Sequence, residues 1–215
     1  MKFIIFDLDD TLLCGDCERY WSSFLANKGL MKEENNSSKI NQFDEDYRNG
    51  VLNFDEYSSY IQEPLRGMNQ DNVDLLLKEF ITKVASKLSD NLTKNLLIES
   101  RSADKVLIAS GSHDFLVKGF ADYFKIESSI GTPTEIKNNV YTGNLAGEPT
   151  FKEGKVRAVE KWCLQNNLKV SNSIFYSDSI NDLPMFEVCG KPIAVNPDKL
   201  LNEIAIKRSY EIINR

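Results

Sequence analysis

Short apolar runs recur along the chain, and each is followed by polar residues. Four such runs occur, at residues 2–6, 105–109, 173–176 and 192–195. Their β-branched and aromatic residues show little alternation of apolar and polar positions, which is typical of strands buried on both faces. Helical periodicity appears between the runs, for example in residues 152–166. Strands that alternate with helices predict an α/β fold, a doubly wound and mostly parallel sheet with helices on both faces.

The first two runs are separated by a long segment with a helical pattern. Within it, Leu77, Ile81, Val84 and Leu88 recur on one helical face. We therefore predict that residues 15–87 form a helical cap inserted over one edge of the sheet. Residues 1–14 and 88–215 are predicted to form the α/β core. The turn-forming stretch 132–149 predicts short hairpin strands, and we expect no second sheet.

Composition and charge narrow the classes of partner. The 215 residues include 26 Lys and Arg against 32 Asp and Glu, a formal net charge of −6, which disfavours binding to nucleic acid or to an anionic membrane. No apolar stretch approaches the ~20 residues that a membrane span requires. Four cysteines are too few for a disulfide scaffold at this length. We expect a cytoplasmic protein, monomeric or homodimeric, whose partner is a small molecule.

Acidic and hydroxyl side chains follow three of the predicted strands. Asp7 and Asp9 follow the first, Ser110 the second, and Asp178 and Asp182 the third. Because the carboxyl ends of parallel strands meet at one edge, these groups are expected to share a pocket. Carboxylates that converge repel one another unless a cation lies among them, and oxygen ligands without histidine favour Mg²⁺.

Two further features point to a phosphate at the same edge. Ser110 and the amides after it open a predicted helix, where backbone N–H groups bind anions. Lys155, directly after Gly154 in the first turn of another helix, offers a cation. Each motif alone is weak, because acidic turns, Ser-Gly-Ser loops and solvated lysines are common. Their combination at the expected strand and helix ends predicts phosphoryl chemistry.

The order of these motifs resembles that of the haloacid dehalogenase superfamily. The four segments are Asp7-Leu8-Asp9-Asp10-Thr11, Ser110-Gly111-Ser112, Gly154-Lys155 and the run from Asp178 to Asp182. The resemblance covers nearly the whole chain and is closest to subfamily IB, with its phosphoserine phosphatase-like and histidinol-phosphatase-like members. It implies a Rossmann-like core, a C1-type helical cap and a Mg²⁺-dependent phosphomonoesterase.

The resemblance also implies roles for individual residues. Asp7 would attack phosphorus and become an aspartyl-phosphate, and Asp9 would protonate the leaving alkoxide and then activate water. Mg²⁺ would be held by Asp7, the main-chain carbonyl of Asp9 and Asp178, supported by Asp182 and Thr11. The residues expected to bind the phosphoryl group are Ser110, Gly111, Lys155 and Asn181.

Cap residues bear on the substrate. Asp16 corresponds to a glutamate that phosphoserine phosphatases direct at the substrate amine, although a hinge turn or an exposed acid is an equal alternative. The arginine that pairs with the phosphoserine carboxylate is replaced by Ile61, so an amine-bearing ester without a carboxylate, such as histidinol phosphate, is favoured. Arg48 and Arg66 are alternative partners for a carboxylate.

Other readings remain open. His113 faces the leaving group in one reading and begins a helix in the other. Asp44-Glu45-Asp46 is expected to be a solvated face, and Cys14 and Cys17 to be incidental thiols at a cap hinge. Phosphoserine hydrolysis, transfer of the phosphoryl group to an acceptor other than water, and a non-enzymatic binding role are the alternatives to hydrolysis of an amino-alcohol phosphate.

Overall fold

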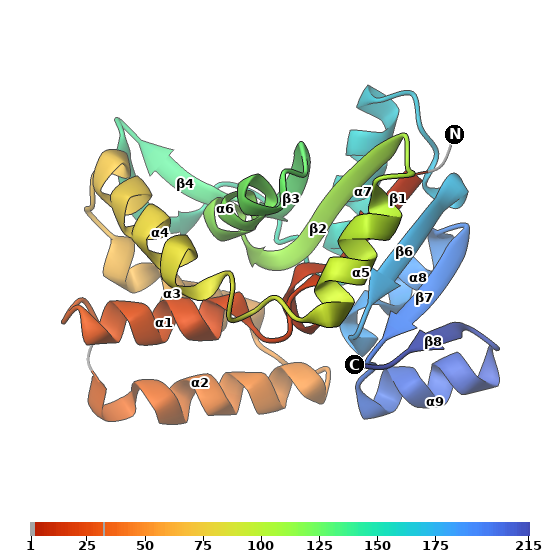
Figure 1. The fold of residues 1–215 in the computed structure, drawn as a ribbon. Helices are drawn as coiled ribbons and strands as arrows, with labels where there is room; N and C mark the ends of the chain where they lie inside the picture. Colours follow the sequence, from red (N-terminus) through yellow and green to blue (C-terminus); the bar gives the residue numbers. More distant parts are fainter. Residues whose placement is uncertain (1–2, 32) are drawn as a thin grey trace.

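The computed structural model describes residues 3–31 and 33–215, and its centre is a parallel sheet of six strands (Figure 1). The strand order is β3-β2-β1-β6-β7-β8. The strands are β1 (Phe3–Phe6), β2 (Lys105–His113), β3 (Ser128–Thr132), β6 (Ser173–Ser177), β7 (Lys191–Val195) and β8 (Glu211–Ile213). Every neighbouring pair is parallel, which confirms the α/β prediction.

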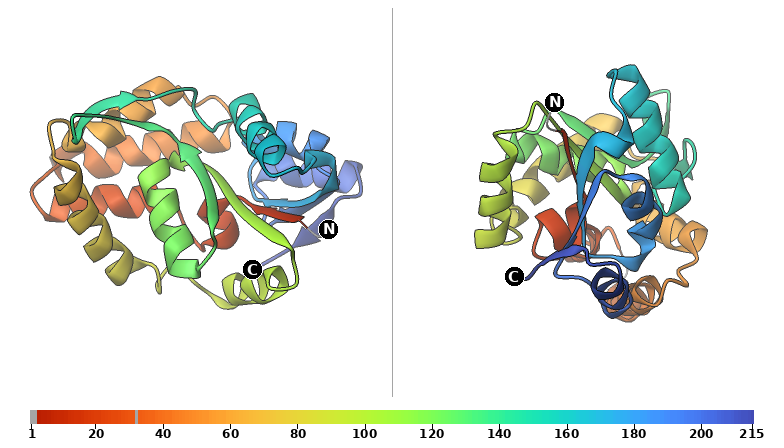
Figure 2. Two further views of the ribbon diagram at one scale, coloured as in Figure 1. Left: turned by 90° about the horizontal axis from the view of Figure 1, so that it is seen from above. Right: turned by 90° about the vertical axis from the view of Figure 1, so that its right-hand side faces the viewer.

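Helices cover both faces of the sheet. Helices α5 and α6 lie on one face and α7 and α8 on the other (Figures 1 and 2). The helices of the core are α5 (Asn91–Ser100), α6 (Asp114–Phe124), α7 (Glu153–Gln165), α8 (Leu183–Val188) and α9 (Lys199–Lys207). The helices of the segment between β1 and β2 that precede α5 are α1 (Cys17–Asn27), α2 (Glu33–Arg48), α3 (Phe54–Gln62) and α4 (Gln70–Val84).

Strand β1 shows why this sequence needs helices on both sides. All four of its residues are at most 1% exposed. Ile4 and Phe6 pack in one apolar cluster, which includes side chains of α5 and α6. Phe3 and Ile5 pack in a second cluster, with side chains of α7, α8 and α9. Because successive side chains of a strand point to opposite faces, an entirely apolar strand requires a core on each side.

Helices α1 to α4 form the helical segment and lie beside one end of the sheet, and α1 and α4 share an aromatic core. The rings of Trp21, Phe24 and Phe80 pack against one another with centroids 5.2–5.6 Å apart. The division into a cap at 15–87 and a core at 1–14 and 88–215 stays a prediction.

A hairpin from the later part of the chain pairs with this helical segment. Strands β4 (Thr134–Lys137) and β5 (Val140–Leu145) form a separate antiparallel sheet, so the hairpin prediction is confirmed and the expectation of no second sheet is wrong. Three backbone hydrogen bonds of 2.8–2.9 Å join residues 67–70 to residues 139–141.

Two features of the sheet differ from the sequence prediction. Strand β2 continues through Ser110 and Gly111 to His113, whereas the sequence predicts a loop there. The strand is extended because His113 pairs with Thr132 of β3 after an irregularity in the register. Strands β3 and β8 were not expected. They are short edge strands: β3 has a single Ile among small polar residues and Gly, and β8 has only three residues, so the sequence pattern does not distinguish them from loops.

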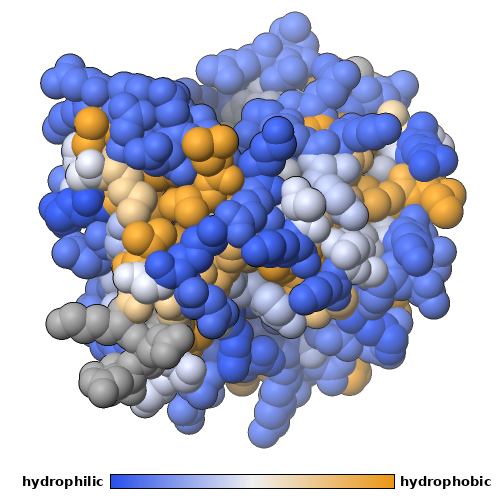
Figure 3. Space-filling view, turned by 60° about the vertical axis from the view of Figure 1, so that its left-hand side comes forward, coloured by the Kyte–Doolittle hydropathy of each residue, from blue (hydrophilic) through white to orange (hydrophobic). Residues whose placement is uncertain are grey.

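The side of the molecule that carries the helical segment is mostly hydrophilic, with a group of apolar side chains among the polar ones (Figure 3). In the described ranges 3–31 and 33–215, no helix has the length and apolar content needed to cross a bilayer.

Candidate active site

The end of β1 turns sharply and places two carboxylates at the edge of the sheet. The amide of Asp7 still donates to the carbonyl of Tyr176, at 2.9 Å. A tight turn, η1 (Leu8–Leu12), follows and is closed by a 2.8 Å hydrogen bond from the Leu13 amide to the Leu8 carbonyl. Asp10 has φ 51° in this turn, a left-handed conformation that Asp tolerates better than most residues. Asp7 and Asp9 thereby enter one cavity.

Asp7 is held by a buried lysine. Nζ of Lys155 lies 3.0 Å from Oδ1 of Asp7 and 2.6 Å from Oδ1 of Asp182. Burial raises the pKa of Asp7 to about 7, with Lys155 lowering it and Asp182 raising it. Burial opposes the charge of Lys155, but Asp182 and Asp7 raise the pKa of its ammonium above the ordinary value. One cation between two carboxylates keeps Asp7 in place without fully neutralising the site.

Gly154 allows Lys155 to approach this closely. A Cβ at Gly154 would lie 2.1 Å from the carbonyl oxygen of Pro149, a separation that no side chain accepts. The first turn of α7 therefore packs directly on the preceding loop. Gly154 is thus required by the close contact with the loop, and Lys155 by the buried ion pairs that follow it.

Asp9 points away from Lys155, toward α1 and β2. Its Oδ1 accepts a 2.6 Å hydrogen bond from the Cys17 amide, and its Oδ2 accepts one of 2.6 Å from Oγ of Ser112. Oγ of Ser110 is 3.5 Å from the same Oδ2. Burial, with a contribution from the negative charge of Asp16, holds the pKa of Asp9 well above its usual range. A protonated carboxyl group at this position suits a general acid.

The residues of the predicted magnesium site lie on the other side of Asp7. Asp178 follows β6, and its Oδ1 accepts a 2.8 Å hydrogen bond from Oγ1 of Thr11. Burial and the neighbouring Asp7 raise the pKa of Asp178 well above its usual value. The Lys155 ammonium pairs with Asp7 and Asp182, so it leaves the charge of Asp178 uncompensated. Two carboxylate side chains at one sheet edge suit a hard cation that keeps part of its water.

Within the described residues, no three His, Cys, Asp or Glu side chains gather into a metal-binding group. This is compatible with the predicted set, which contains only two side-chain ligands, Asp7 and Asp178, and one main-chain carbonyl. The Thr11 hydroxyl donates to Asp178, and its supporting role at a metal site stays a prediction. Asp182 faces Lys155 and Ser177.

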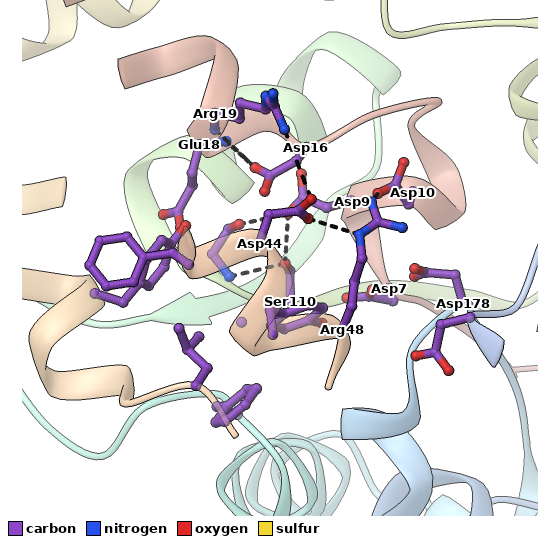
Figure 4. A pocket seen from close by; sticks show the side chains of 18 of the residues that line it. Asp7, Asp9, Asp10, Asp16, Glu18, Arg19, Asp44, Arg48, Ser110 and Asp178 are labelled. Carbon is purple, nitrogen blue, oxygen red and sulfur yellow. Dashed lines mark hydrogen bonds and ion pairs between the residues drawn. The ribbon is translucent and has the colours of Figure 1, made fainter. Parts of the chain in front are cut away.

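Asp7, Asp9, Ser110 and Asp178 line a cavity of about 410 Å³ between the sheet edge and the helical segment. Ten of its charged and hydroxyl residues are labelled in Figure 4. Its acidic side chains are Asp7, Asp9, Asp10, Asp16, Glu18, Asp44, Asp178 and Asp198, and its basic ones are Arg19, Arg48 and Lys199. The rings of Phe43, Tyr47, Phe54, Tyr57 and Phe151 form its apolar wall. A ligand of this cavity would meet an acidic and aromatic surface.

Asp16 begins α1 and lines the cavity. Its Oδ1 accepts hydrogen bonds from the amides of Glu18 and Arg19, at 2.8 and 3.0 Å. No described residue donates to its Oδ2 in the structure. Burial, and next the charge of Glu18, raise the pKa of Asp16 to about 7. Asp16 is therefore a helix cap that also presents one carboxylate oxygen to the cavity.

Glu18 is buried and joins three elements. Its Oε1 accepts from the backbone amide of His113 at 2.8 Å and lies 2.5 Å from Nδ1 of the same residue. Its Oε2 accepts from the hydroxyl of Tyr57 on α3. Burial alone would raise the pKa of Glu18, but His113 and Tyr57 hold it below its usual value. Glu18 thus ties α1 to α3 and to the end of β2.

Five of the predicted site residues do not line the cavity: Thr11, His113, Lys155, Asn181 and Asp182. His113 is fully buried, and its Nε2 is 2.9 Å from Oγ of Ser58, so it fits the helix-start alternative. Asn181 donates through Nδ2 to the carbonyl of Tyr47 at 2.8 Å and so contacts the helical segment. Ser110 and Gly111 line the cavity, whereas Lys155 reaches it only through its contact with Asp7.

Sequence reasoning did not place six charged lining residues at the site: Glu18, Arg19, Asp44, Arg48, Asp198 and Lys199. Asp44 lies in a run expected to be solvated, yet it borders the cavity and accepts a 3.0 Å hydrogen bond from Nε of Arg48. Arg48 also approaches Oδ2 of Asp10 at 3.8 Å, which brings α2 to the β1 turn (Figure 4). Glu18 had one signal, since it lies on the same helical face of α1 as the apolar Trp21 and Leu25. No pattern in the sequence indicates that α2 packs beside the β1 turn and brings Asp44 and Arg48 to the cavity.

The chain was compared with known proteins. The family model of the haloacid dehalogenase-like hydrolases matches residues 4–187. A histidinol-phosphatase from Neisseria meningitidis is 30% identical over 98% of this chain and 97% of its own length. Phosphoserine phosphatase SerB1 from Mycobacterium tuberculosis is 29% identical over 60% of this chain and 42% of its own length.

Solved structures agree on the fold. A protein of unknown function from Bordetella pertussis is 29% identical, with a TM-score of 0.89 over 99% of this chain and 98% of the other. A phospho-aspartyl intermediate analogue of phosphoserine phosphatase has a TM-score of 0.70 at 18% identity, over 99% of this chain and 92% of the other. The chain belongs to the haloacid dehalogenase-like hydrolases, and within them it is a phosphatase of the phosphoserine phosphatase-like kind.

Proposed function

We propose that this phosphatase is Mg²⁺-dependent and hydrolyses a small phosphomonoester whose alcohol part carries an amine, with histidinol phosphate as the leading candidate. The observation that carries the proposal is Asp16, a cavity-lining carboxylate with an oxygen that accepts no hydrogen bond from the described residues. A positively charged amine is the natural partner of that oxygen. The aromatic wall of the cavity suits a flat apolar or heteroaromatic group beside the amine.

In the proposed reaction, Oδ of Asp7 attacks phosphorus while the bond from phosphorus to the ester oxygen breaks. Asp9 donates its proton to the departing oxygen, and its raised pKa favours the protonated form that this step needs. Asp9, now a carboxylate, then takes a proton from water, which attacks the phosphorus of the aspartyl-phosphate and restores Asp7. The products are the free alcohol and inorganic phosphate.

The other residues hold charge in this reaction. Lys155 stays between Asp7 and Asp182 and offsets the negative charge that gathers on the phosphoryl group. Ser110 and Gly111 at the cavity wall offer hydrogen-bond donors to phosphoryl oxygens. Enzymes of this family typically use Mg²⁺, and here Asp7, Asp178 and the Asp9 carbonyl would hold it, where it would neutralise the phosphate and polarise it.

Phosphoserine is the second candidate substrate, and Arg48 is the observation in its favour. Ile61, at the position where the resemblance places a carboxylate-binding arginine, is 1% exposed and does not line the cavity. Arg48 and Arg19 do line it. Both guanidinium groups already face Asp44, however, at 3.0 and 3.9 Å, which leaves a carboxylate ligand in competition with that residue.

The test compares three substrates: histidinol phosphate, phosphoserine and an aryl phosphate that has neither amine nor carboxylate. Each is assayed by phosphate release with Mg²⁺ and with chelator, in the unaltered protein, Asp16→Asn and the exposed control Glu45→Gln. A buried charge-assisted hydrogen bond contributes about 1.5–3 kcal/mol, so Asp16→Asn should lower kcat/KM for the amine substrate by about 10- to 100-fold. The aryl phosphate should be affected far less.

The amine assignment fails if Asp16→Asn slows the aryl phosphate as strongly as the amine substrate. It also fails if phosphoserine is hydrolysed with much the higher kcat/KM. Hydrolysis of all three esters that persists in chelator would refute the Mg²⁺ requirement. Formation of a phosphorylated alcohol when alcohols are added would favour phosphoryl transfer over hydrolysis.

A further inference from the structure

Two chain segments connect the helical segment to the sheet, and they lie side by side. The first leaves the β1 turn through Leu13 and Cys14, and the second returns from α4 through Leu88 to Asp90. The Cys14 amide donates to the Leu88 carbonyl at 2.9 Å. The Thr93 hydroxyl, in the first turn of α5, donates to the Leu12 carbonyl at 2.8 Å. The two connections therefore meet directly behind the turn that carries Asp9.

One arginine from the far end of the chain binds both connections. Nη2 of Arg215 donates to the main-chain carbonyls of Thr11 and Leu13. Nη1 of the same guanidinium lies 2.7 Å from Oδ2 of Asp90. The side chain of Arg215 is 15% exposed and that of Asp90 35%, so the guanidinium is largely buried while the carboxylate is partly open to solvent. Although burial raises the pKa of Asp90, the Thr93 amide and Arg215 lower it to a net value below the usual one.

The topology of the sheet places Arg215 beside the β1 turn. Strand β8 is parallel to β7, so its carboxyl end points to the same edge as the carboxyl end of β1. In Figure 1 the C-terminus lies near the start of α5 and the red turn that follows β1. Pairing of Asn196 with Ile213, through a 2.7 Å backbone hydrogen bond, anchors the strand just before Arg215. A planar guanidinium then supplies several donors with fixed directions, which an ammonium cannot match.

The peptide units that Arg215 holds belong to the catalytic turn. Thr11, whose carbonyl accepts from Arg215, donates its hydroxyl to Oδ1 of Asp178 at 2.8 Å. The same turn contains the left-handed Asp10 and closes through the Leu13 amide. A shift of the Thr11 carbonyl would therefore move its side chain relative to Asp178 and move the main chain of the adjacent Asp9–Asp10 segment.

We propose that Arg215 is a positioning residue for the phosphatase reaction: by joining the two connections to the helical segment, it holds the turn that carries Asp9 and Thr11 in its reactive geometry. The proposal rests on phosphatase activity and not on the preference for an amine. Arg215 touches neither the cavity nor the reacting atoms, so its effect on turnover must act through the turn.

The test uses Arg215→Ala, Arg215→Lys and the control Arg208→Ala, assayed with an aryl phosphate. Arg208 is an exposed arginine of the same terminal region that pairs with Glu187 at 3.0 Å. Misplacement of reacting groups by about 1 Å lowers rates by up to about 100-fold, so Arg215→Ala should lose about 10- to 100-fold in kcat, with a smaller change in KM. Arg215→Lys should lie between Arg215→Ala and the unaltered protein. Arg208→Ala should be unchanged.

Chemical rescue separates positioning from a general loss of structure. Free guanidinium ion at millimolar concentration, far below denaturing levels, should restore several-fold of the lost kcat in Arg215→Ala, whereas sodium chloride at the same ionic strength should not. The unaltered protein and Arg208→Ala should not respond. The proposal is overturned if kcat of Arg215→Ala stays within about twofold of the unaltered value, if Arg208→Ala shares the loss, or if guanidinium restores nothing.

Hydrogen exchange gives a readout independent of turnover. In Arg215→Ala, the amides of residues 10–16 and 86–93 should exchange faster, while those of β2 and β6 should not. Unchanged exchange in both connections would refute the proposal even if activity falls. If the unaltered protein hydrolyses no ester, the proposed function fails, and the exchange measurement still decides the role of Arg215.

Discussion

Lys155 provides the sharpest test of the charge balance at the site. Its Nζ lies 3.0 Å from Asp7 and 2.6 Å from Asp182, and its side chain is only 3% exposed. Lys155→Met keeps most of the aliphatic stem and removes the charge. The variant would leave two buried carboxylates facing each other without a cation. At an effective dielectric constant of about 20, unit charges 3 Å apart interact by about 5–6 kcal/mol.

Part of that energy is recovered by protonation, so the expected loss depends on pH. Breaking a buried ion pair typically destabilises a protein by about 3–5 kcal/mol. Burial already raises the pKa of Asp7 to about 7, against the effect of Lys155, and removal of Lys155 raises it further. Between the unfolded pKa of about 4 and this folded value, the folded state binds more protons than the unfolded state, so stability falls as pH rises.

The measurement is urea unfolding of the metal-free protein at about pH 5 and about pH 8. Lys155→Met should lose about 3–5 kcal/mol of unfolding free energy at the higher pH and clearly less at the lower one. Lys161→Met, at an exposed position of the same helix, is the matched control. In the presence of Mg²⁺, kcat should fall by about 10²- to 10³-fold, as when a donor to transition-state charge is removed.

Two results would refute this reasoning. If the loss of stability is the same at both pH values, Asp7 does not titrate in the way that its burial requires. If Lys161→Met reproduces the loss, the effect comes from the methionine and not from the buried charge.

Three further predictions concern the same site. Because burial raises the pKa of Asp7 to about 7, Mg²⁺ must displace a proton when it binds, and its apparent affinity should rise between about pH 5 and about pH 8. Titration calorimetry in two buffers would detect the released proton. An affinity that does not change with pH would contradict the prediction. Thr11→Val removes the 2.8 Å hydrogen bond to Asp178 and should weaken Mg²⁺ binding by about 10-fold or more with the fold intact, so an unchanged affinity would rule out the supporting role. Gly154→Ala places a Cβ 2.1 Å from the Pro149 carbonyl oxygen and should destabilise the protein by about 1–3 kcal/mol. Thermal unfolding measures this loss. An unchanged unfolding midpoint would show that the preceding loop moves to accommodate the methyl group.

The sheet could be predicted where burial leaves a compositional signature. Strands β1 and β7 are apolar because helices cover both of their faces, and their short runs stand out in the sequence. Edge strands β3 and β8 lack that signature, since each has one neighbouring strand and a partly exposed face. The sequence predicts an end of β2 at Ser-Gly-Ser, which is typical of turns, whereas in the structure the strand bulges there and pairs with β3 again at His113.

The candidate site likewise contains residues that the sequence could place and residues that it could not. The acids at the strand ends could be placed together, because parallel topology alone brings strand ends to one edge. The positions of Arg48 and Arg215 follow from how α2 and the end of β8 pack on the β1 turn. Those contacts join residues far apart in sequence and leave no periodic signal. Sequence reasoning therefore predicted the chemistry of the edge, and only the structure shows what surrounds it.

The pairing of the β4–β5 hairpin with residues 67–70 affects how this protein can be re-engineered. The hairpin lies outside the predicted cap in sequence but is joined to it by three backbone hydrogen bonds, with the Met68 carbonyl accepting from the Tyr141 amide. Exchange of residues 15–87 alone with those of a relative would leave these backbone groups without their partners. A chimaera meant to transfer substrate preference should therefore exchange residues 134–145 together with residues 15–87, as one recombination unit in two pieces.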